Sequence, residues 1–149
     1  MSSSCRQSAL RFLKIRPRSA AELKSKLESK GFEASEIDET LQWLQNIQLI
    51  DDRAFTKSWI QYRLARPFGF RRIVLELKEK GVNPALIEEE IGLVKADTDE
   101  AKAALEIASR RWKKLTGIEP VKKKKRIFDF LVRRGFSPDI IFKVIKNIN

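Results

Sequence analysis

Residues 72–82 read RIVLELKEKGV, an amphipathic stretch with helical spacing that runs into a glycine and a further apolar residue. The same form occurs at residues 22–32, ELKSKLESKGF, and at residues 126–136, RIFDFLVRRGF. Glycine directly after the last helical turn takes the left-handed conformation that ends many helices. We therefore predict three helices that stop at equivalent glycines, Gly31, Gly81 and Gly135.

Apolar residues keep one register around these glycines, which lie 50 and 54 residues apart. The equivalent positions are Leu23, Ile73 and Ile127 eight residues before the glycine, Leu27, Leu77 and Leu131 four before it, and Ile37, Ile87 and Ile141 six after it. A period of this size is typical of tandem helical repeats, which bind partners along an extended surface. We predict an all-α fold of three tandem three-helix repeats forming an elongated, curved helical array, with repeats at residues 1–50, 51–96 and 97–149.

Capping residues mark where helices begin. Ser19 followed by Glu22 has the form of a capping box, and either Asp51 or Asp52 can cap a helix over residues 53–66. The two aspartates also suit a metal site or a pair of catalytic acids in a metal-dependent nuclease. Capping is the favoured interpretation, because no nucleophile or ligand cluster accompanies them.

Aromatic side chains in the first two repeats have spacings that predict how they pack. Phe55, Trp59 and Tyr62 recur at helical spacing, so we expect them to form a core stripe. Trp43 lies off the apolar stripe of its helix, and we expect it to pack between repeats.

Composition excludes several kinds of catalysis. The 149 residues contain no histidine and one cysteine, Cys5, which removes Ser-His and Cys-His nucleophile pairs and the usual zinc sites. We expect no enzymatic activity, no cofactor and no metal. No apolar stretch is long enough to span a membrane, and we expect a cytoplasmic monomer.

Positive charge is concentrated near the C-terminus. Of the formal net charge of +11, residues 110–149 contribute +10, with 13 Lys/Arg against three Asp/Glu. An excess of this kind indicates a polyanionic partner, above all nucleic acid, although a solvated surface that keeps the chain in solution also fits.

Three groups of basic residues, together with Arg133 and Arg134, are candidates for binding. Residues 122–126, KKKKR, stand at a predicted helix start, where cations are unfavourable; they suit either phosphate contact or a solvated helix face. Four arginines surround a turn at residues 67–70, and residues 110–114, RRWKK, place cations around Trp112, which either stacks a base or packs in the core. The candidate contact residues for a partner protein or DNA are Arg63, Arg66, Arg71, Arg72, Lys113, Lys114, Lys122, Lys123, Lys124, Lys125, Arg126, Arg133 and Arg134.

Several motifs together resemble the RecX regulatory proteins. They are LRFLKIRPRSAAEL at residues 10–23, KGF at 30–32, LIDDRAF at 49–55, Arg63, Gly69, and ELKEKGV at 76–82. They occur in the expected order over about residues 8–94, and beyond these the resemblance rests on the repeat pattern alone.

This resemblance implies a partner that the residues by themselves do not name. RecX-like proteins are tandem three-helix repeats that bind RecA filaments on single-stranded DNA and modulate, usually inhibit, recombinase activity and its ATPase. It implies that a curved surface of the chain lies in the groove of the RecA nucleoprotein filament. The alternative is a repeat protein that binds single- or double-stranded DNA directly and acts by competing for it.

Overall fold

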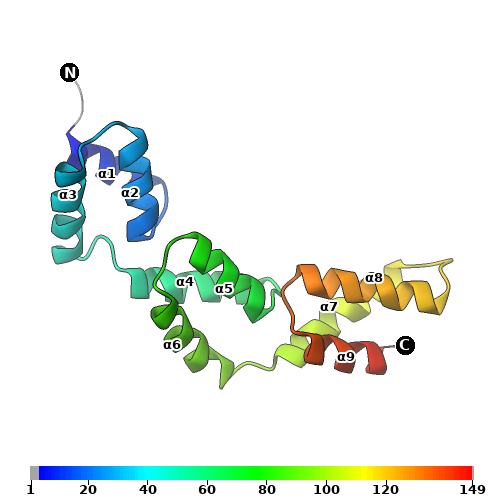
Figure 1. Ribbon diagram of the computed structural model, residues 1–149. Coiled ribbons are helices and arrows are strands. Elements are labelled where there is room, and N and C mark those ends of the chain that lie inside the picture. Colours follow the sequence, from blue (N-terminus) through cyan, green and yellow to red (C-terminus); the bar gives the residue numbers. More distant parts are fainter. Residues whose placement is uncertain (1–3, 149) are drawn as a thin grey trace. The chain divides into compact units, whose positions relative to one another are not determined.

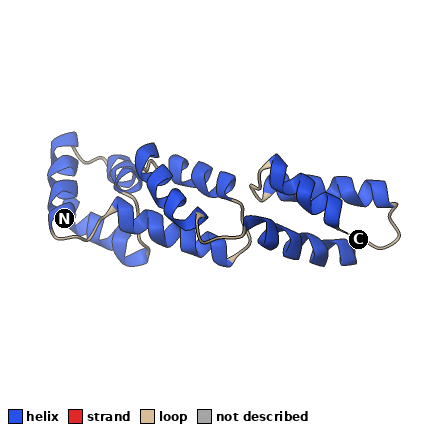
Figure 2. Ribbon diagram, turned by 90° about the horizontal axis from the view of Figure 1, so that it is seen from below, coloured by secondary structure: helices blue, strands red, loops and turns tan. Residues whose placement is uncertain are grey.

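The computed structural model describes residues 4–148, and every regular element in that range is a helix (Figures 1 and 2). The helices are α1 (Cys5–Ile15), α2 (Ala20–Ser29), α3 (Ala34–Asn46), α4 (Asp52–Ala65), α5 (Phe70–Glu79), α6 (Pro84–Lys95), α7 (Glu100–Lys114), α8 (Pro120–Arg133) and α9 (Pro138–Asn147). The predicted all-α fold of tandem three-helix repeats is confirmed.

The chain divides into two compact units. The N-terminal unit comprises the residues up to Ser58 together with Leu77–Glu90, and the C-terminal unit comprises Trp59–Glu76 together with the residues from Ile91 onward. The helices α4, α5 and α6 each contribute residues to both units.

The three predicted glycines end α2, α5 and α8 in the same way. Gly31, Gly81 and Gly135 have φ of +86°, +76° and +90°. The amide of the residue after each glycine donates to the carbonyl four residues before that glycine, as in the 3.1 Å bond from Phe136 to Leu131. This is a Schellman motif, which satisfies carbonyls that the helix end leaves without a partner.

The shared register forms the cores. All nine of the predicted equivalent apolar positions are at most 1% exposed. In the N-terminal unit, side chains from α1, α2 and α3 make one cluster, which includes Cys5 and Leu44. In the C-terminal unit, α7, α8 and α9 make another, in which Ala104 and Ala108 are fully buried.

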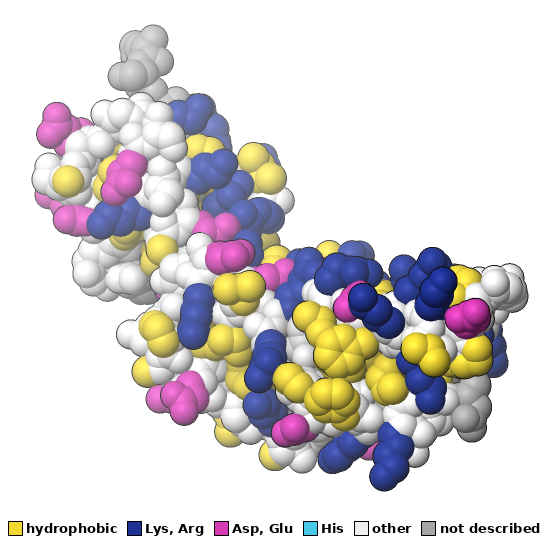
Figure 3. All heavy atoms as spheres, turned by 45° about the vertical axis from the view of Figure 1, so that its right-hand side comes forward, with side chains coloured by type: hydrophobic (Ala, Val, Ile, Leu, Met, Phe, Trp, Pro, Cys, Tyr) yellow, Lys and Arg dark blue, Asp and Glu magenta, His cyan; other side chains and the backbone are white. Residues whose placement is uncertain are grey.

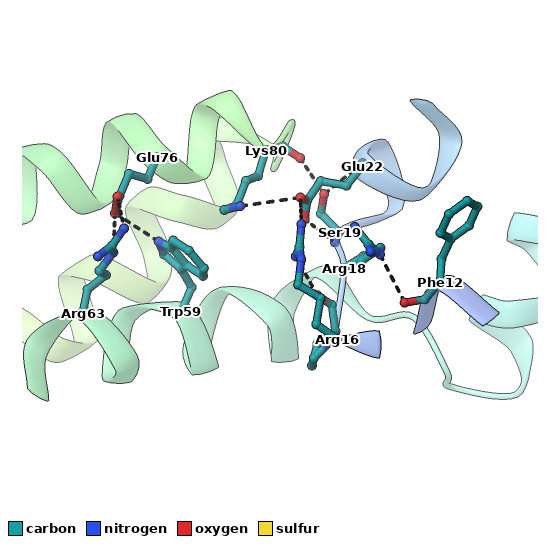
Figure 4. Close-up of polar contacts among 10 residues, drawn as sticks. Phe12, Arg16, Arg18, Ser19, Glu22, Trp59, Arg63, Glu76 and Lys80 are labelled. Carbon is teal, nitrogen blue, oxygen red and sulfur yellow. Dashed lines mark hydrogen bonds and ion pairs between the residues drawn. The ribbon is translucent and has the colours of Figure 1, made fainter. Parts of the chain in front are cut away.

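A turn-to-turn junction joins the first and second repeats within the N-terminal unit. Ser19 caps α2 in a capping box with Glu22, as predicted, and its hydroxyl also donates to the carbonyl of Lys80 at 2.5 Å. The carboxylate of Glu22 lies 2.7 Å from Arg16 and 3.5 Å from Lys80 (Figure 4). A Cβ added to Gly81 would lie 2.3 Å from that of Ala21, so the close approach requires glycine there.

The same kind of junction joins the second and third repeats within the C-terminal unit. The amide of Gly69 donates to the carbonyl of Arg134 at 2.7 Å, and that of Arg71 donates to Gly135 at 3.1 Å. A Cβ added to Gly69 would lie 2.3 Å from the Gly135 carbonyl oxygen. Here glycine is needed on both turns, because a Cβ on Gly135 would meet the side chain of Arg72 at 2.3 Å.

Each junction also has a carboxylate that reaches across it. Asp51 caps its own helix by accepting from Arg53 and Ala54. Its neighbour Asp52 instead accepts from the amide of Ala20 at the start of α2, at 2.9 Å. In the C-terminal unit, Glu100 accepts from the amide of Phe70 at the start of α5, at 3.2 Å. Asp52 is the first residue of α4, and Glu100 is the first residue of α7. The two junctions therefore use a carboxylate at the equivalent position of the repeat.

Two aromatic side chains do not lie where their spacing predicts. Tyr62 is 47% exposed, so the expected core stripe of α4 is wrong at that position. Trp43 packs against the core of its own repeat with the guanidinium of Arg6 4.4 Å from its ring centroid, and not between repeats. Helical spacing indicates on which side of its helix each of these residues lies. Whether a side chain on that side is covered depends on where the neighbouring helices pack.

Candidate functional site

The basic run, residues 122–126, occupies the first turns of α8. Its exposed side chains are Lys122, Lys124, Lys125 and Arg126. None of these four forms an ion pair with another of the residues 4–148. Cations at the positive end of a helix are unfavourable, so their placement opposes local preference and leaves four uncompensated charges open to a partner.

Lys123 behaves differently from the rest of the run. Its ammonium nitrogen lies 4.0 Å from the ring centroid of Trp112, and Trp112 itself is half-buried against the C-terminal core. This packing favours the core interpretation of Trp112 over base stacking. Lys113 and Lys114 are exposed in the last turn of α7, where cations are favourable.

Arg63 is held inside the C-terminal unit by Glu76, an acid that no pattern in the sequence pairs with it. Its guanidinium donates to both carboxylate oxygens of Glu76, at 2.8 and 2.5 Å, and the indole of Trp59 donates to the same carboxylate at 3.3 Å (Figure 4). A bidentate arginine–carboxylate pair is among the strongest side-chain contacts. This pairing gives Arg63 a structural role beside its candidate role in binding.

Phe68 lies in the middle of the arginine-rich turn. Three guanidinium carbons lie 4.6 to 4.8 Å from its ring centroid, those of Arg63, Arg72 and Arg134. Phe70 is buried, and Phe68 is half-buried. Arginines cover the ring of Phe68, so it is not an exposed hydrophobic anchor.

Arginine–aromatic stacking continues onto α7 and α8. Arg134 also lies 5.2 Å from the ring centroid of Phe130, and Arg111 lies 4.4 Å from the same centroid. We call Arg72, Arg111 and Arg134 the arginine cluster. In the sequence, Arg111 stands out only as a neighbour of Trp112. Arg111 follows Ala108, which faces the core, by three residues. This spacing could have predicted that Arg111 lies at the edge of the packed face of α7.

The arginine cluster carries more positive charge than its acids offset. Burial, followed by the nearby charges of Arg72 and Arg111, lowers the pKa of Arg134. Glu76 lies 3.7 Å from Arg72 but is already paired with Arg63. Within the described residues, neither Arg111 nor Arg134 forms an ion pair or a side-chain hydrogen bond. These two guanidiniums are therefore available to an anion.

The remaining candidate arginines are on the same unit. Arg66 is exposed and lies 4.9 Å from the ring centroid of Tyr62. Arg71 is exposed beside Glu100, and Arg133 is exposed while its carbonyl accepts from Arg72 at 2.9 Å.

Apolar side chains are also exposed on the C-terminal unit. Val132 and Phe142 are 50% and 60% exposed, and the rings of Phe128 and Phe142 are 5.8 Å apart. Figure 3 shows apolar side chains gathered in a patch with lysines and arginines around it. A mixed surface of this kind suits a macromolecular partner more than a small ligand.

The described part of the chain holds no group of three or more His, Cys, Asp or Glu side chains that could bind a metal ion. Asp51 and Asp52 serve the two capping contacts given above. None of the helices within residues 4–148 is long and apolar enough to cross a membrane.

Fold and surface together define a tandem helical-repeat protein with a basic C-terminal repeat. Three family models match consecutive parts of it: the first three-helix domain of RecX at residues 5–44, the second at residues 51–90 and the third at residues 97–145. The chain belongs to the RecX family of regulatory proteins.

Individual relatives give the same result. "Regulatory protein RecX" from Pasteurella multocida (strain Pm70) is 31% identical over 140 residues, covering 93% of this chain and 84% of the relative. The protein of that name from Chlorobaculum tepidum is 34% identical, with 97% and 88% covered. The crystal structure of RecX from Lactobacillus salivarius has the same fold, with a TM-score of 0.82, 24% identity and coverage of 97% and 94%.

Proposed function

We propose that this chain binds RecA filaments on single-stranded DNA and modulates, mainly by inhibiting, their recombinase and ATPase activities. The observation that carries the proposal is that the match to the RecX regulatory family runs through all three repeats. In this role the chain acts without catalysing a reaction, as a monomer in the cytoplasm, where it regulates recombination, DNA repair and the SOS response.

Exposed charge and apolar surface support a macromolecular partner. Four uncompensated cations on α8 and the exposed Phe142 belong to the same unit, so this unit offers both electrostatic steering and apolar contact. A regulator shifts an equilibrium only through its different affinities for two states. Inhibition therefore requires that the chain bind RecA in one state of assembly or nucleotide more tightly than in another.

Titration of RecA's single-strand-dependent ATPase with this chain tests the proposal. We expect hydrolysis to fall as the chain approaches a stoichiometric ratio to RecA. An unchanged rate at saturating amounts of the chain, with the cognate RecA, would contradict it.

The exposed basic run supports a second candidate function, direct binding of single- or double-stranded DNA that inhibits RecA by competition. Its test is a variant in which Lys122, Lys124, Lys125 and Arg126 become Gln, while Lys123 stays to keep its contact with Trp112. The matched control exchanges four exposed lysines of the N-terminal unit for Gln: Lys24, Lys26, Lys30 and Lys57.

Competition for DNA requires that DNA binding and ATPase inhibition weaken together in the variant of the basic run and not in the control. Inhibition that survives the loss of DNA binding contradicts competition and leaves direct contact with the filament.

A further inference from the structure

Three arginines meet in the C-terminal unit: Arg72 on α5, Arg111 on α7 and Arg134 at the C-terminal cap of α8. Arg72 and Arg134 share the ring of Phe68, at 4.8 and 4.7 Å, and Arg134 and Arg111 share the ring of Phe130, at 5.2 and 4.4 Å. Arg134 therefore lies between the other two. Stacking of guanidinium faces on aromatic rings leaves their N–H edges for other partners.

The backbone holds this arrangement in place. Arg134 is the C-cap residue directly after α8, and its carbonyl accepts from the amide of Gly69 at 2.7 Å. Arg72 is the third residue of α5, and its guanidinium donates to the carbonyl of Arg133 at 2.9 Å. Because both turns are fixed by hydrogen bonds, the two arginines are oriented before any partner arrives.

Like charges held this close are costly without an anion. Burial and then the charges of Arg72 and Arg111 act against the charged form of Arg134, and Glu76, the carboxylate paired with Arg72 at 3.7 Å, is engaged by Arg63 and Trp59. Stacking on a ring stabilises an exposed cation only modestly, and the same stacking is available to an arginine that has an acidic neighbour. Stacking therefore does not by itself explain why three arginines lie together with too few carboxylates to neutralise their charge.

We propose that Arg111 and Arg134, with Arg72 beside them, form a phosphate-binding site that takes a phosphodiester group of a nucleic acid backbone. Planar guanidinium forks match the spacing of phosphate oxygens and donate two parallel hydrogen bonds. A nucleic acid is favoured over a free phosphate because the same unit carries four more exposed cations on α8, which a single phosphate group leaves without a partner. The inference deepens the proposed function, since the DNA of the filament supplies the phosphates.

Binding of a fluorescein-labelled oligo(dT) to the full chain, measured by anisotropy over a series of salt concentrations without RecA, tests the site. The variants are Arg111→Gln and Arg134→Gln, with Arg111→Lys to keep the charge and remove the fork. Lys102→Gln is the matched control, because Lys102 is an exposed cation on the same helix as Arg111. A thermal melt of each variant identifies any loss of folding, and the exposed Arg111 provides the test if Arg134→Gln unfolds.

We expect each Gln variant to weaken binding about tenfold. The magnitude of the slope of log affinity against log salt should fall by about 0.7 for each phosphate contact that is lost. Arg111→Lys should bind with intermediate affinity, and Lys102→Gln should bind like the wild type. Affinity and salt slope that are unchanged in a folded Arg111→Gln variant and in Arg134→Gln would overturn the site.

Two further measurements complete the test. One distinguishes a nucleic acid phosphate from free phosphate, and the other distinguishes failure of this inference from failure of the proposed function. If inorganic phosphate raises the melting temperature of the wild type but not of the Gln variants, while oligo(dT) binding is unaffected, the nucleic acid source is wrong. If the Gln variants bind oligo(dT) normally but no longer inhibit the RecA ATPase, the arginine cluster contacts protein carboxylates, which overturns this inference and leaves the proposed function standing. Loss of oligo(dT) binding supports the inference whether or not the ATPase is inhibited.

Discussion

The backbone amide of Gly69 donates to the carbonyl of Arg134 at 2.7 Å, which links the turn before α5 to the turn after α8. This bond brings Arg72 and Arg134 to the same aromatic ring. The same close approach of the two turns therefore serves both the packing between repeats and the assembly of a cationic surface, and the glycines permit it.

Exchange for alanine of two glycines that end helices, Gly31 and Gly135, should separate backbone strain from steric overlap. Gly31→Ala places a side chain at positive φ in open space, so we expect a loss of about 1–2 kcal/mol in the free energy of unfolding. Gly135→Ala adds an overlap with the side chain of Arg72 and should cost more. Urea unfolding of the variants measures both values.

Gly92→Ala is the control for those two variants. Gly92 lies inside α6 with open space around it, so alanine should stabilise the chain by about 0.5–1 kcal/mol through helix propensity. Equal losses for Gly31→Ala and Gly135→Ala would contradict the close approach at the second junction.

The Arg63–Glu76 pair should contribute to stability and not to binding alone. The side chains of Arg63 and Glu76 are 18% and 14% exposed. Arg63→Gln leaves the carboxylate without its bidentate partner, and we expect a loss of about 2 kcal/mol in the free energy of unfolding. A double-mutant cycle with Glu76→Gln measures the coupling. Additive effects of the two substitutions would show that the pair is not coupled.

Glu100 should make stability fall as the pH rises. Burial raises its pKa above the ordinary value of 4.5, although the Phe70 amide, Lys95 and Arg71 act in the opposite direction. The folded chain then binds more protons at this site than the unfolded chain does. Its contribution to stability is full below pH 4.5 and declines as the pH rises through the raised pKa.

The variant Glu100→Gln tests that sign, because its amide oxygen still accepts from Phe70 while the charge is gone. We expect the variant to gain stability relative to the wild type between pH 4 and neutral pH, measured by urea unfolding at each pH. A gain of the wild type over the variant in that window would show that favourable contacts outweigh burial.

Glu22 should act in the opposite sense at the first junction. Burial raises its pKa, but the hydrogen bonds from Arg16 and Ser19 and the charge of Lys80 outweigh this effect, and the net shift is downward. Its contribution is present above the ordinary pKa of 4.5 and is lost as the pH falls through the lowered value. Glu22→Gln should therefore be less stable than the wild type at neutral pH, with a difference that disappears in acid. A difference that persists at the lowest pH would contradict the ionic origin.

The repeat period made most of the fold predictable. Equivalent glycines and apolar positions such as Leu27, Leu77 and Leu131 are local signals, because helix ends and buried stripes depend on nearby residues. The exposure of Tyr62 and the packing of Trp43 were not predictable in this way, since each depends on which neighbouring helix covers it.

The candidate site was only partly predictable for the same reason. Basic residues could be picked out from the sequence, including the run on α8. The pairing of Arg63 with Glu76 depends on the packing of α4 against α5, and the meeting of Arg72, Arg111 and Arg134 depends on the contact between the second and third repeats. No local pattern carries that information.

Co-sedimentation of the chain with RecA filaments preassembled on single-stranded DNA tests the central claim most directly. The same DNA coated with an unrelated single-strand-binding protein is the control for DNA contact alone. We predict that the chain sediments with the RecA filament in a saturable ratio and remains in the supernatant with the control complex. A chain that stays in the supernatant with RecA filaments at every concentration, or that sediments equally with both complexes, would contradict the account.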